Sequence, residues 1–193
     1  MKRLILSIII LFPQIYIKGQ SLPIDFESGA VLTSTFTDFD GGTANVLANS
    51  QLSGINLSNK IAKIVRNGGA AWSGSKIILS SNLDFSTNNV LKMKVFTSAP
   101  VGTIIKFKLE GVGSTERDVQ TTVSNAWEEL KWDFTGEPAN FNTLVFMFDF
   151  GNIGDGTANS TFLFDDIQQI FGGSQLDLPV TFEDNSVNYT TTD

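Results

Sequence analysis

Residues 90–96, Val-Leu-Lys-Met-Lys-Val-Phe, alternate apolar and charged side chains along the middle of the chain. Residues 103–110 (Thr-Ile-Ile-Lys-Phe-Lys-Leu-Glu) and 127–134 (Trp-Glu-Glu-Leu-Lys-Trp-Asp-Phe) repeat this pattern. A period of two places successive side chains on opposite faces of a β-strand. Three such strands, each with one apolar and one polar face, predict antiparallel sheets with one side in a core and the other in water.

Short β-type runs extend in both directions from these three, separated by Gly, Asn, Ser and Asp. The run at residues 144–148 is apolar on both faces, which predicts a central strand covered on both sides. No stretch has a helical period with caps. The sequence therefore predicts an all-β fold, a jelly-roll β-sandwich of two antiparallel sheets. The predicted strands cover residues 23–27, 31–38, 43–48, 59–66, 75–80, 90–96, 103–110, 117–123, 127–134, 143–150 and 161–170.

The chain begins the same motif twice. The motif at residues 22–27 (Leu-Pro-Ile-Asp-Phe-Glu) recurs in similar form at residues 178–183 (Leu-Pro-Val-Thr-Phe-Glu). The distance between the two copies is about the length of one ordinary domain. We therefore predict a β-sandwich module at 21–171, followed at 172–193 by a linker and the truncated start of a second copy. Further domains of the same chain are its expected partners.

Residues 1–20 resemble a secretory signal peptide. Lys2 and Arg3 precede an apolar run, and small or polar residues follow near position 20. The run is too short to span a bilayer, so we expect no membrane insertion. The predicted location is outside the cell, either secreted or at the cell surface.

Composition excludes many functions. The chain has no Cys and no His, which removes disulfides, thiolate sites, the usual zinc sites and Ser-His-Asp catalysis. The formal net charge is −7, and it becomes about −10 if residues 1–20, with Lys2, Arg3 and Lys18, are removed. Nucleic acid is therefore not an expected partner. Carboxylate chemistry and oxygen-ligand metals remain open.

Acidic residues near both ends of the module suggest a metal site. If the first and last strands lie side by side, Glu27 could meet Asp165 and Asp166, although 138 residues separate Glu27 from Asp165. Calcium takes six to eight oxygen ligands, so these acids are candidate ligands of a structural calcium ion. The alternative is that they are strand-end acids that face water.

Trp72 lies in a glycine-rich segment, residues 67–75, with few neighbours to bury it. An exposed indole can stack on a sugar ring, and Arg66, Asn67 and Lys76 flank it with groups that could hydrogen-bond hydroxyls. The alternative is a tryptophan folded back over the sandwich edge. Trp127 and Trp132 are expected to pack in or at the core, because Trp132 is in phase with Leu130.

Four lysines, Lys92, Lys94, Lys106 and Lys108, are expected on the same side of two adjacent strands. Such a strip could contact an anionic polysaccharide. The alternative, which we favour, is a solvated outer face.

Taken together, these motifs resemble a family of bacterial secreted carbohydrate-binding modules. The resemblance covers residues 22–170. The motifs that carry it are 22–27, 53–56, 60–65, 72–74, 127–130, 148–151, 154–156 and 164–167. Such jelly rolls are often found in tandem beside laminarinase-type or other polysaccharide-degrading domains. The resemblance implies a non-catalytic module with a structural calcium ion, held by residues matching Glu27 and Asp165.

The predicted function is therefore glycan binding, which would tether a larger secreted protein to polysaccharide. Two alternatives remain: a structural or adhesion spacer without a ligand, or the accessory domain of a glycoside hydrolase whose catalytic part lies downstream. A hydrolase within residues 21–171 itself is not expected, because no cluster of spaced acids lies on one strand to supply the two carboxylates.

Overall fold

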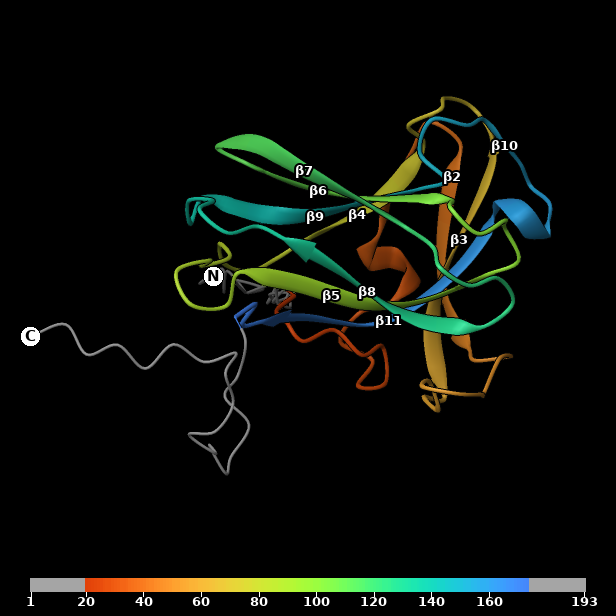
Figure 1. The fold of residues 1–193 in the computed structure, drawn as a ribbon, viewed down its shortest axis with the longest axis horizontal. Helices are drawn as coiled ribbons and strands as arrows, with labels where there is room; N and C mark the ends of the chain where they lie inside the picture. The colour runs from red at the N-terminus through yellow and green to blue at the C-terminus, as the bar shows by residue number, and fades with distance from the viewer. Residues whose placement is uncertain (1–19, 174–193) are drawn as a thin grey trace, which may run out of the picture.

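The computed structural model describes residues 20–173, and in it two antiparallel β-sheets face each other (Figure 1). The predicted jelly-roll β-sandwich is confirmed. The signal peptide predicted at 1–20 and the second copy predicted to begin at 178 lie outside the described residues, apart from Gln20.

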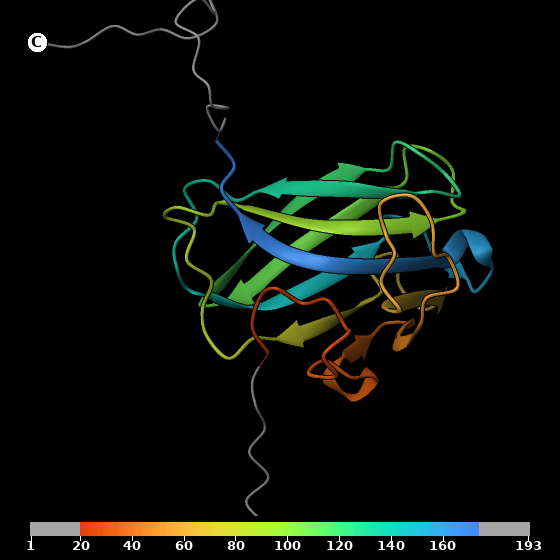
Figure 2. The same cartoon turned by 90° about the horizontal axis from the view of Figure 1, so that it is seen from below.

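The first sheet has five strands in the order β1-β4-β9-β6-β7, and the second has the path β10-β3-β11-β5-β8, with β2 paired to β3. Figure 2 shows β11, in blue, running beside β5 across the second sheet. Two short 3₁₀ turns, η1 and η2, complete the described elements. Their bounds are η1 Thr33–Thr35, β1 Thr37–Phe39, β2 Gly42–Ala48, β3 Lys60–Gly68, β4 Gly74–Ile78, β5 Val90–Thr97, β6 Ile104–Gly111, β7 Gly113–Gln120, β8 Trp127–Asp133, β9 Phe141–Phe148, β10 Gly154–Asp155, η2 Ala158–Ser160 and β11 Thr161–Ile170.

The core between the sheets is rich in phenylalanine. Phe146 of β9 is fully buried, and its ring centroid lies 5.2 Å from that of Phe107 and 5.1 Å from that of Phe164 on the opposite sheet. Fully burying one such side chain contributes about 1.5–3 kcal/mol to folding. Trp132 is also fully buried, and its Nε1 donates a hydrogen bond to the Ile105 carbonyl at 3.1 Å. Its predicted place in the core is confirmed.

The two ends of the module lie side by side, as predicted. Ile24 and Ile167 form an antiparallel bridge in which each backbone N–H donates to the other carbonyl at 2.9 Å. The strand predicted at 23–27 is reduced to this bridge, because Phe26 turns the backbone to a positive φ of 58°. Its ring still packs edge-on against Phe164 at 5.7 Å.

The predicted lysine strip is wrong. Lys92 and Lys94 lie on β5 in the second sheet, whereas Lys106 and Lys108 lie on β6 in the first. Alternation assigns a residue to a face of its strand, but it does not say in which sheet the strand lies. The chain crosses between sheets after β5, so these lysines occupy two separate surfaces.

β9 is covered on both faces, as predicted for residues 144–148. Leu144, Phe146 and Phe148 belong to the core, while Val145 and Met147 point to the other side of the sheet. These two outward residues are nevertheless only 2% and 5% exposed. The side chains that cover them form the candidate site.

Candidate functional site

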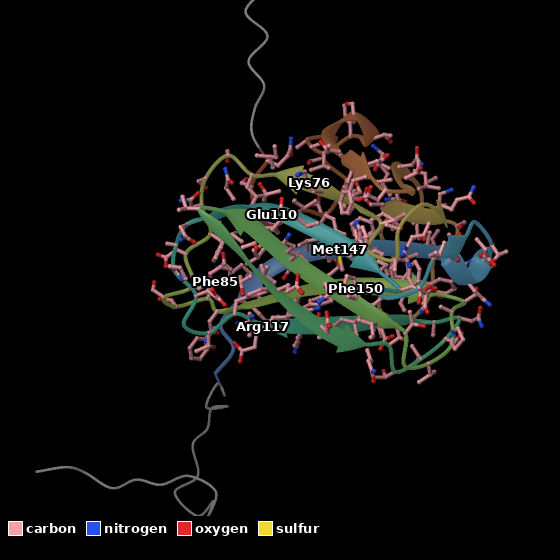
Figure 3. All side chains as sticks on the ribbon, turned by 90° about the horizontal axis from the view of Figure 1, so that it is seen from above. Lys76, Phe85, Glu110, Arg117, Met147 and Phe150 are labelled. Atoms are coloured by element: carbon pink, nitrogen blue, oxygen red, sulfur yellow. The ribbon has the colours of Figure 1, made fainter. Side chains whose placement is uncertain are left out.

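A groove of about 450 Å³ lies on the outer face of the five-stranded sheet. We call it the outer groove; Val145 and Met147 of β9 lie at its base, and lysines and glutamates come from β4, β6 and β7. Figure 3 shows Lys76, Glu110, Met147 and Phe150 on this face. The lining residues are Phe39, Asp40, Trp72, Lys76, Lys108, Glu110, Glu116, Val145, Met147 and Phe150.

Trp72 stands at the end of the outer groove, and 56% of it is exposed. Its Nε1 donates a hydrogen bond to Asp40 Oδ2 at 2.9 Å. The turn at Asp40 and the loop at Gly69 approach so closely that a Cβ on Gly69 would lie 1.8 Å from the Asp40 carbonyl oxygen. The Ala70 N–H also donates to that oxygen at 2.9 Å. The exposed indole is thus held in one orientation, which lowers the entropy cost of binding a ligand.

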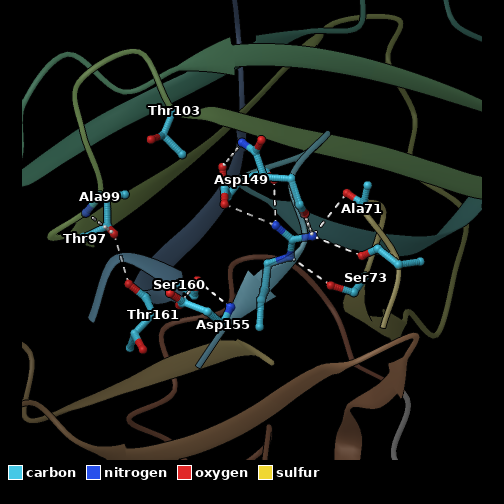
Figure 4. A network of polar contacts seen from close by, with 12 residues as sticks. Ala71, Ser73, Thr97, Ala99, Thr103, Asp149, Asp155, Ser160 and Thr161 are labelled. Carbon is cyan, nitrogen blue, oxygen red and sulfur yellow. Dashed lines mark hydrogen bonds and ion pairs between the residues drawn. The ribbon is translucent and has the colours of Figure 1, made fainter. Parts of the chain in front are cut away.

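Arg66 lies beneath this loop and is 0% exposed. Figure 4 shows Ala71, Ser73 and Asp149 converging on one guanidinium group, that of Arg66. Its Nε donates to Ser73 Oγ at 2.9 Å, and Nη1 donates to the Asp149 carbonyl at 2.6 Å. Nη2 donates to the Asn152 carbonyl at 2.6 Å and to the Ala71 carbonyl at 3.1 Å.

The sequence-based role of Arg66 therefore needs correction. Burial lowers the pKa of Arg66 from its ordinary value, and Asp149, whose Oδ2 lies 3.5 Å from Nη1, opposes that shift. The guanidinium uses its donors inside the protein, so it is not available to a glycan hydroxyl. On a β-strand the side chain next to an exposed one points inward, and Arg66 precedes the exposed Asn67.

Asn67 and Lys76 are also separated by the fold. Asn67 lies opposite Asp155 of β10 and does not line the outer groove. Lys76 does line it, and its Nζ lies 3.4 Å from Glu110 Oε2. Of the four predicted glycan-contacting residues, the structure brings Trp72 and Lys76 together.

The charges in the outer groove are paired. Glu110 forms ion pairs with two lysines. Its Oε2 lies 3.4 Å from the Lys76 Nζ, and its Oε1 lies 2.9 Å from the Lys108 Nζ. The hydrogen bond from Lys108 lowers the pKa of Glu110 below its usual range. Lys106, buried beside the groove, lies 2.7 Å from Glu116, and its Nζ lies 4.3 Å from the ring centroid of Phe150. The groove thus presents ionised carboxylates and ammonium groups whose charges largely cancel.

The second predicted site lies at the junction of the two ends. Asp165 is 0% exposed; its Oδ1 accepts a hydrogen bond from the Asp166 N–H at 2.8 Å, while Oδ2 has no hydrogen-bond partner. Burial raises the pKa of Asp165 to about 6, and hydrogen bonding by the Ser58 side chain, the Asp166 N–H and the Asn56 side chain partly offsets this. A β-bulge between Asp165 and Gln168 interrupts the pairing of β11 with β5. Bulges of this kind re-aim side chains next to functional sites.

Glu27 lies beside the same segment of chain. Its Oε1 accepts a hydrogen bond from the Lys60 N–H at 2.8 Å, and Asn56 and Ser58 of that segment lie next to Asp165. Asp166 instead forms an ion pair with Lys94, so its carboxylate has a cation partner within the protein. Of the three predicted ligands, Glu27 and Asp165 form no ion pair with a basic side chain in the described part of the chain.

Glu27 and Asp165 are suitable ligands for a cation that prefers oxygen donors, such as calcium. A buried carboxylate oxygen without a partner is costly, and a divalent cation would supply the missing charge. Within residues 20–173 no three acidic residues form a metal-binding cluster, so backbone or amide oxygens would have to complete the coordination of calcium. Asn56, which is also fully buried with an unpartnered Nδ2, was not among the predicted ligands.

Sequence reasoning missed most of the outer groove. Met147 and Val145 were assigned only to a covered strand, and Phe39, Phe150 and Glu110 were not connected with Trp72. Trp127, by contrast, was placed well at the core edge: it is 7% exposed and its Nε1 donates to the Gln51 carbonyl at 2.7 Å.

No protein-family model matches the chain, and no curated protein sequence matches it either. Solved structures do match. An exo-β-agarase aligns with a TM-score of 0.59 and 12% identity over 80% of this chain. A family 11 carbohydrate-binding module of a cellulosomal cellulase of Clostridium thermocellum aligns with a TM-score of 0.54 and 15% identity, covering 79% of this chain and 95% of that module.

A further match is a family 11 carbohydrate-binding module from Clostridium thermocellum in complex with a β-1,3-1,4-mixed-linked tetrasaccharide, with a TM-score of 0.50 and 12% identity, covering 71% of this chain and 89% of that one. The chain has the fold of a carbohydrate-binding module. At these identities the likeness establishes the fold alone. The chain spans only 26% of the exo-β-agarase that it matches. No helix in the described part of the chain is long and apolar enough to cross a membrane.

Proposed function

We propose that this protein is a non-catalytic glycan-binding module and that the outer groove holds the glycan. The observation that carries the proposal is the half-exposed Trp72, fixed by Asp40 at the end of a groove with an apolar base. The fold supports it, since the matched modules include one solved with a bound tetrasaccharide.

The groove offers the two kinds of contact that a sugar chain needs. Trp72 presents an indole face on which the C–H face of a pyranose ring can stack, and Met147 and Val145 provide further apolar surface. Glu110 accepts and Lys76 and Lys108 donate hydrogen bonds, so both sides of a hydroxyl can be satisfied. Ordered ion pairs keep these groups in place without a ligand.

The glycan class that fits is an uncharged polysaccharide. Lys76 and Lys108 already share Glu110, Lys106 beside the groove is paired with Glu116, and Asp40 is a further acid in the groove lining. An anionic polysaccharide would meet no unpaired cation among these residues and would be repelled by the acidic protein as a whole.

Affinity electrophoresis of residues 20–173 through gels that contain a panel of polysaccharides tests the binding. Replacing a large aromatic anchor costs about 2 kcal/mol or more, so Trp72→Ala should weaken binding roughly 30-fold. Trp72→Phe should retain part of the affinity, because a ring face remains. Phe171→Ala is the matched control: Phe171 is 49% exposed but does not line the outer groove. Absence of binding to any glycan would favour the ligand-free spacer.

The charge class has its own test. Hydroxyethyl and carboxymethyl derivatives of one glycan backbone differ mainly in charge, so they should be compared at low and high salt. We expect retardation by the neutral derivative that changes little with salt, since screening weakens only interactions between charges. Stronger binding to the carboxymethyl derivative would contradict the proposal.

We also propose a stabilising calcium ion, held by Glu27 and Asp165 with oxygens of the neighbouring 56–60 segment. The cation would supply positive charge to the buried carboxylate and join the two ends of the module. Its role would be structural, because these residues do not line the outer groove.

The proposal extends to export from the cell and to further modules of the same chain. The signal-like residues 1–20 support export, and the repeated motif at 178–183 supports a tandem protein tethered to polysaccharide by several modules. Linked modules bind a polymer more tightly than single ones, because the second contact is intramolecular.

A further inference from the structure

Two loops carry the aromatic residues at the end of the outer groove. The loop at residues 69–73 carries Trp72, and the loop at residues 149–152 carries Phe150. The rings of Trp72 and Phe150 do not pack against each other. The distance between the two rings therefore depends on how the two loops are held together. A single backbone hydrogen bond, from the Gly151 N–H to the Ala71 carbonyl at 3.0 Å, joins them directly.

Arg66 joins the same two loops from below. Its guanidinium donates to Ala71 and Ser73, the residues on either side of Trp72, and to the carbonyls of Asp149 and Asn152 around Phe150. Figure 4 shows these contacts converging from both sides. The group is fully buried, and it lines no part of the groove itself.

We propose that Arg66 is a positioning residue for glycan binding, which sets the distance and orientation of Trp72 relative to Phe150. The inference rests on the proposed glycan-binding function of the outer groove. It replaces the direct ligand contact predicted from the sequence with an indirect one.

Only arginine can make this set of contacts. Its planar guanidinium carries five N–H donors in a fixed arrangement, whereas a lysine ammonium is a point charge with three rotating donors. Arg66→Lys therefore keeps the charge near Asp149 but leaves loop carbonyls without donors. The loops should then loosen, and because Arg66 shares the inward face of β3 with Ala62 and Ile64, the variant must be studied under conditions where it is folded.

Tryptophan fluorescence reports on Trp72 without any glycan. The chain has three tryptophans, and Trp127 and Trp132 are 7% and 0% exposed, against 56% for Trp72. Quenching by acrylamide thus measures mainly the accessibility of Trp72. A looser loop should raise the quenching constant and shift the emission to longer wavelength.

The experiment compares Arg66→Lys with Arg117→Lys in residues 20–173. Arg117 is a matched control, because its guanidinium also ties segments together, at the Asp133 carbonyl and Glu137, but away from the groove. We expect about tenfold weaker glycan binding and stronger quenching in Arg66→Lys at a temperature where it is folded. Neither change is expected in Arg117→Lys.

Ser73→Ala is the second variant, to be used if Arg66→Lys does not fold. It removes only the hydroxyl that accepts the hydrogen bond from Arg66 Nε. It should weaken binding and increase quenching in the same direction by a smaller factor. Unchanged affinity and unchanged quenching in a folded Arg66→Lys or Ser73→Ala variant would overturn the inference. If the wild-type protein binds no glycan, the proposed function fails, and the quenching result alone decides whether Arg66 positions Trp72.

Discussion

Arg66 on β3 and Asp165 on β11 are both charged and both 0% exposed, yet their surroundings differ completely. The guanidinium of Arg66 finds acceptors on two loops and a carboxylate at 3.5 Å. Asp165 has one carboxylate oxygen with no hydrogen-bond partner. One buried charge is thus hydrogen-bonded by the chain itself and lies near an opposite charge, whereas the other keeps one oxygen without a hydrogen-bond partner.

The shifts in pKa agree with this difference. Burial lowers the pKa of Arg66, but the nearby Asp149 opposes the shift. For Asp165, burial is the largest influence and the neighbouring Asp166 adds to it, so the pKa rises to about 6. A cation beside Asp165 would reverse this balance.

Removing the satisfied charge should have the largest effect on stability. Arg66→Met deletes the donors but leaves the loop carbonyls and the Asp149 carboxylate in place. Breaking a buried pair in this way costs about 3–5 kcal/mol. Urea unfolding should show that loss in the free energy of unfolding. A loss below about 1 kcal/mol would mean that water replaces the guanidinium at no cost.

Supplying the missing charge should give the next largest effect. Calcium at 100 times its dissociation constant should stabilise the protein by about 2.7 kcal/mol. Asp165→Asn should abolish this gain; in chelator it should be at least as stable as the wild type, because it removes an uncompensated buried charge. Thermal unfolding with calcium and with chelator measures both effects.

Controls define the ligands in that experiment. Glu27→Gln keeps an oxygen for the Lys60 N–H but should reduce the calcium gain. Asp118→Asn, a change at an exposed acid on β7 of the other sheet, should leave the gain intact. An equal calcium response in Asp165→Asn and wild type would contradict the proposed site.

An exposed but hydrogen-bonded carboxylate, that of Asp155, should give the smallest of the three effects. Asp155 is exposed, but the Thr157 hydroxyl and N–H and the Ser160 hydroxyl donate to it and lower its pKa to about 2. Because the folded pKa lies below the unfolded value of 3.8, its contribution is present above about pH 4 and is lost as the pH falls toward 2.

Asp155→Asn should therefore unfold more easily than the wild type near neutral pH, and the difference should shrink between pH 4 and 2. The measurement is the urea midpoint as a function of pH. A difference that stays constant down to pH 2 would show that the partners of Asp155 do not favour its ionised form.

The sequence was sufficient to predict the fold class, because alternation of apolar and polar residues shows which face of each strand is buried. The patterns at residues 90–96 and 127–134 correspond to the neighbouring strands β5 and β8. The motif at residues 22–27 marked the start of the module, and its Ile24 pairs with Ile167 near the end. η1 replaced part of the strand predicted at 31–38, since Thr33 Oγ1 instead accepts the Val46 N–H at the edge of β2.

The site was only partly predictable, because it depends on contacts between distant segments. The composition around Trp72 indicated an exposed indole, but nothing local showed that Arg66 would reach Asp149, 83 positions away. Likewise the groove joins Glu110 of β6 to Lys76 of β4 across β9, and strand order cannot be derived from periodicity.

The most direct test of the outer groove is an NMR titration of isotope-labelled residues 20–173 with a neutral oligosaccharide that the gel assay selects. Shifts should concentrate on the Trp72 indole N–H and on the amides of β4, β6 and β9 that surround Met147. Shifts confined to β5, β8 and β11, or unchanged at Trp72 while the glycan binds, would contradict the central claim that this groove is the binding site.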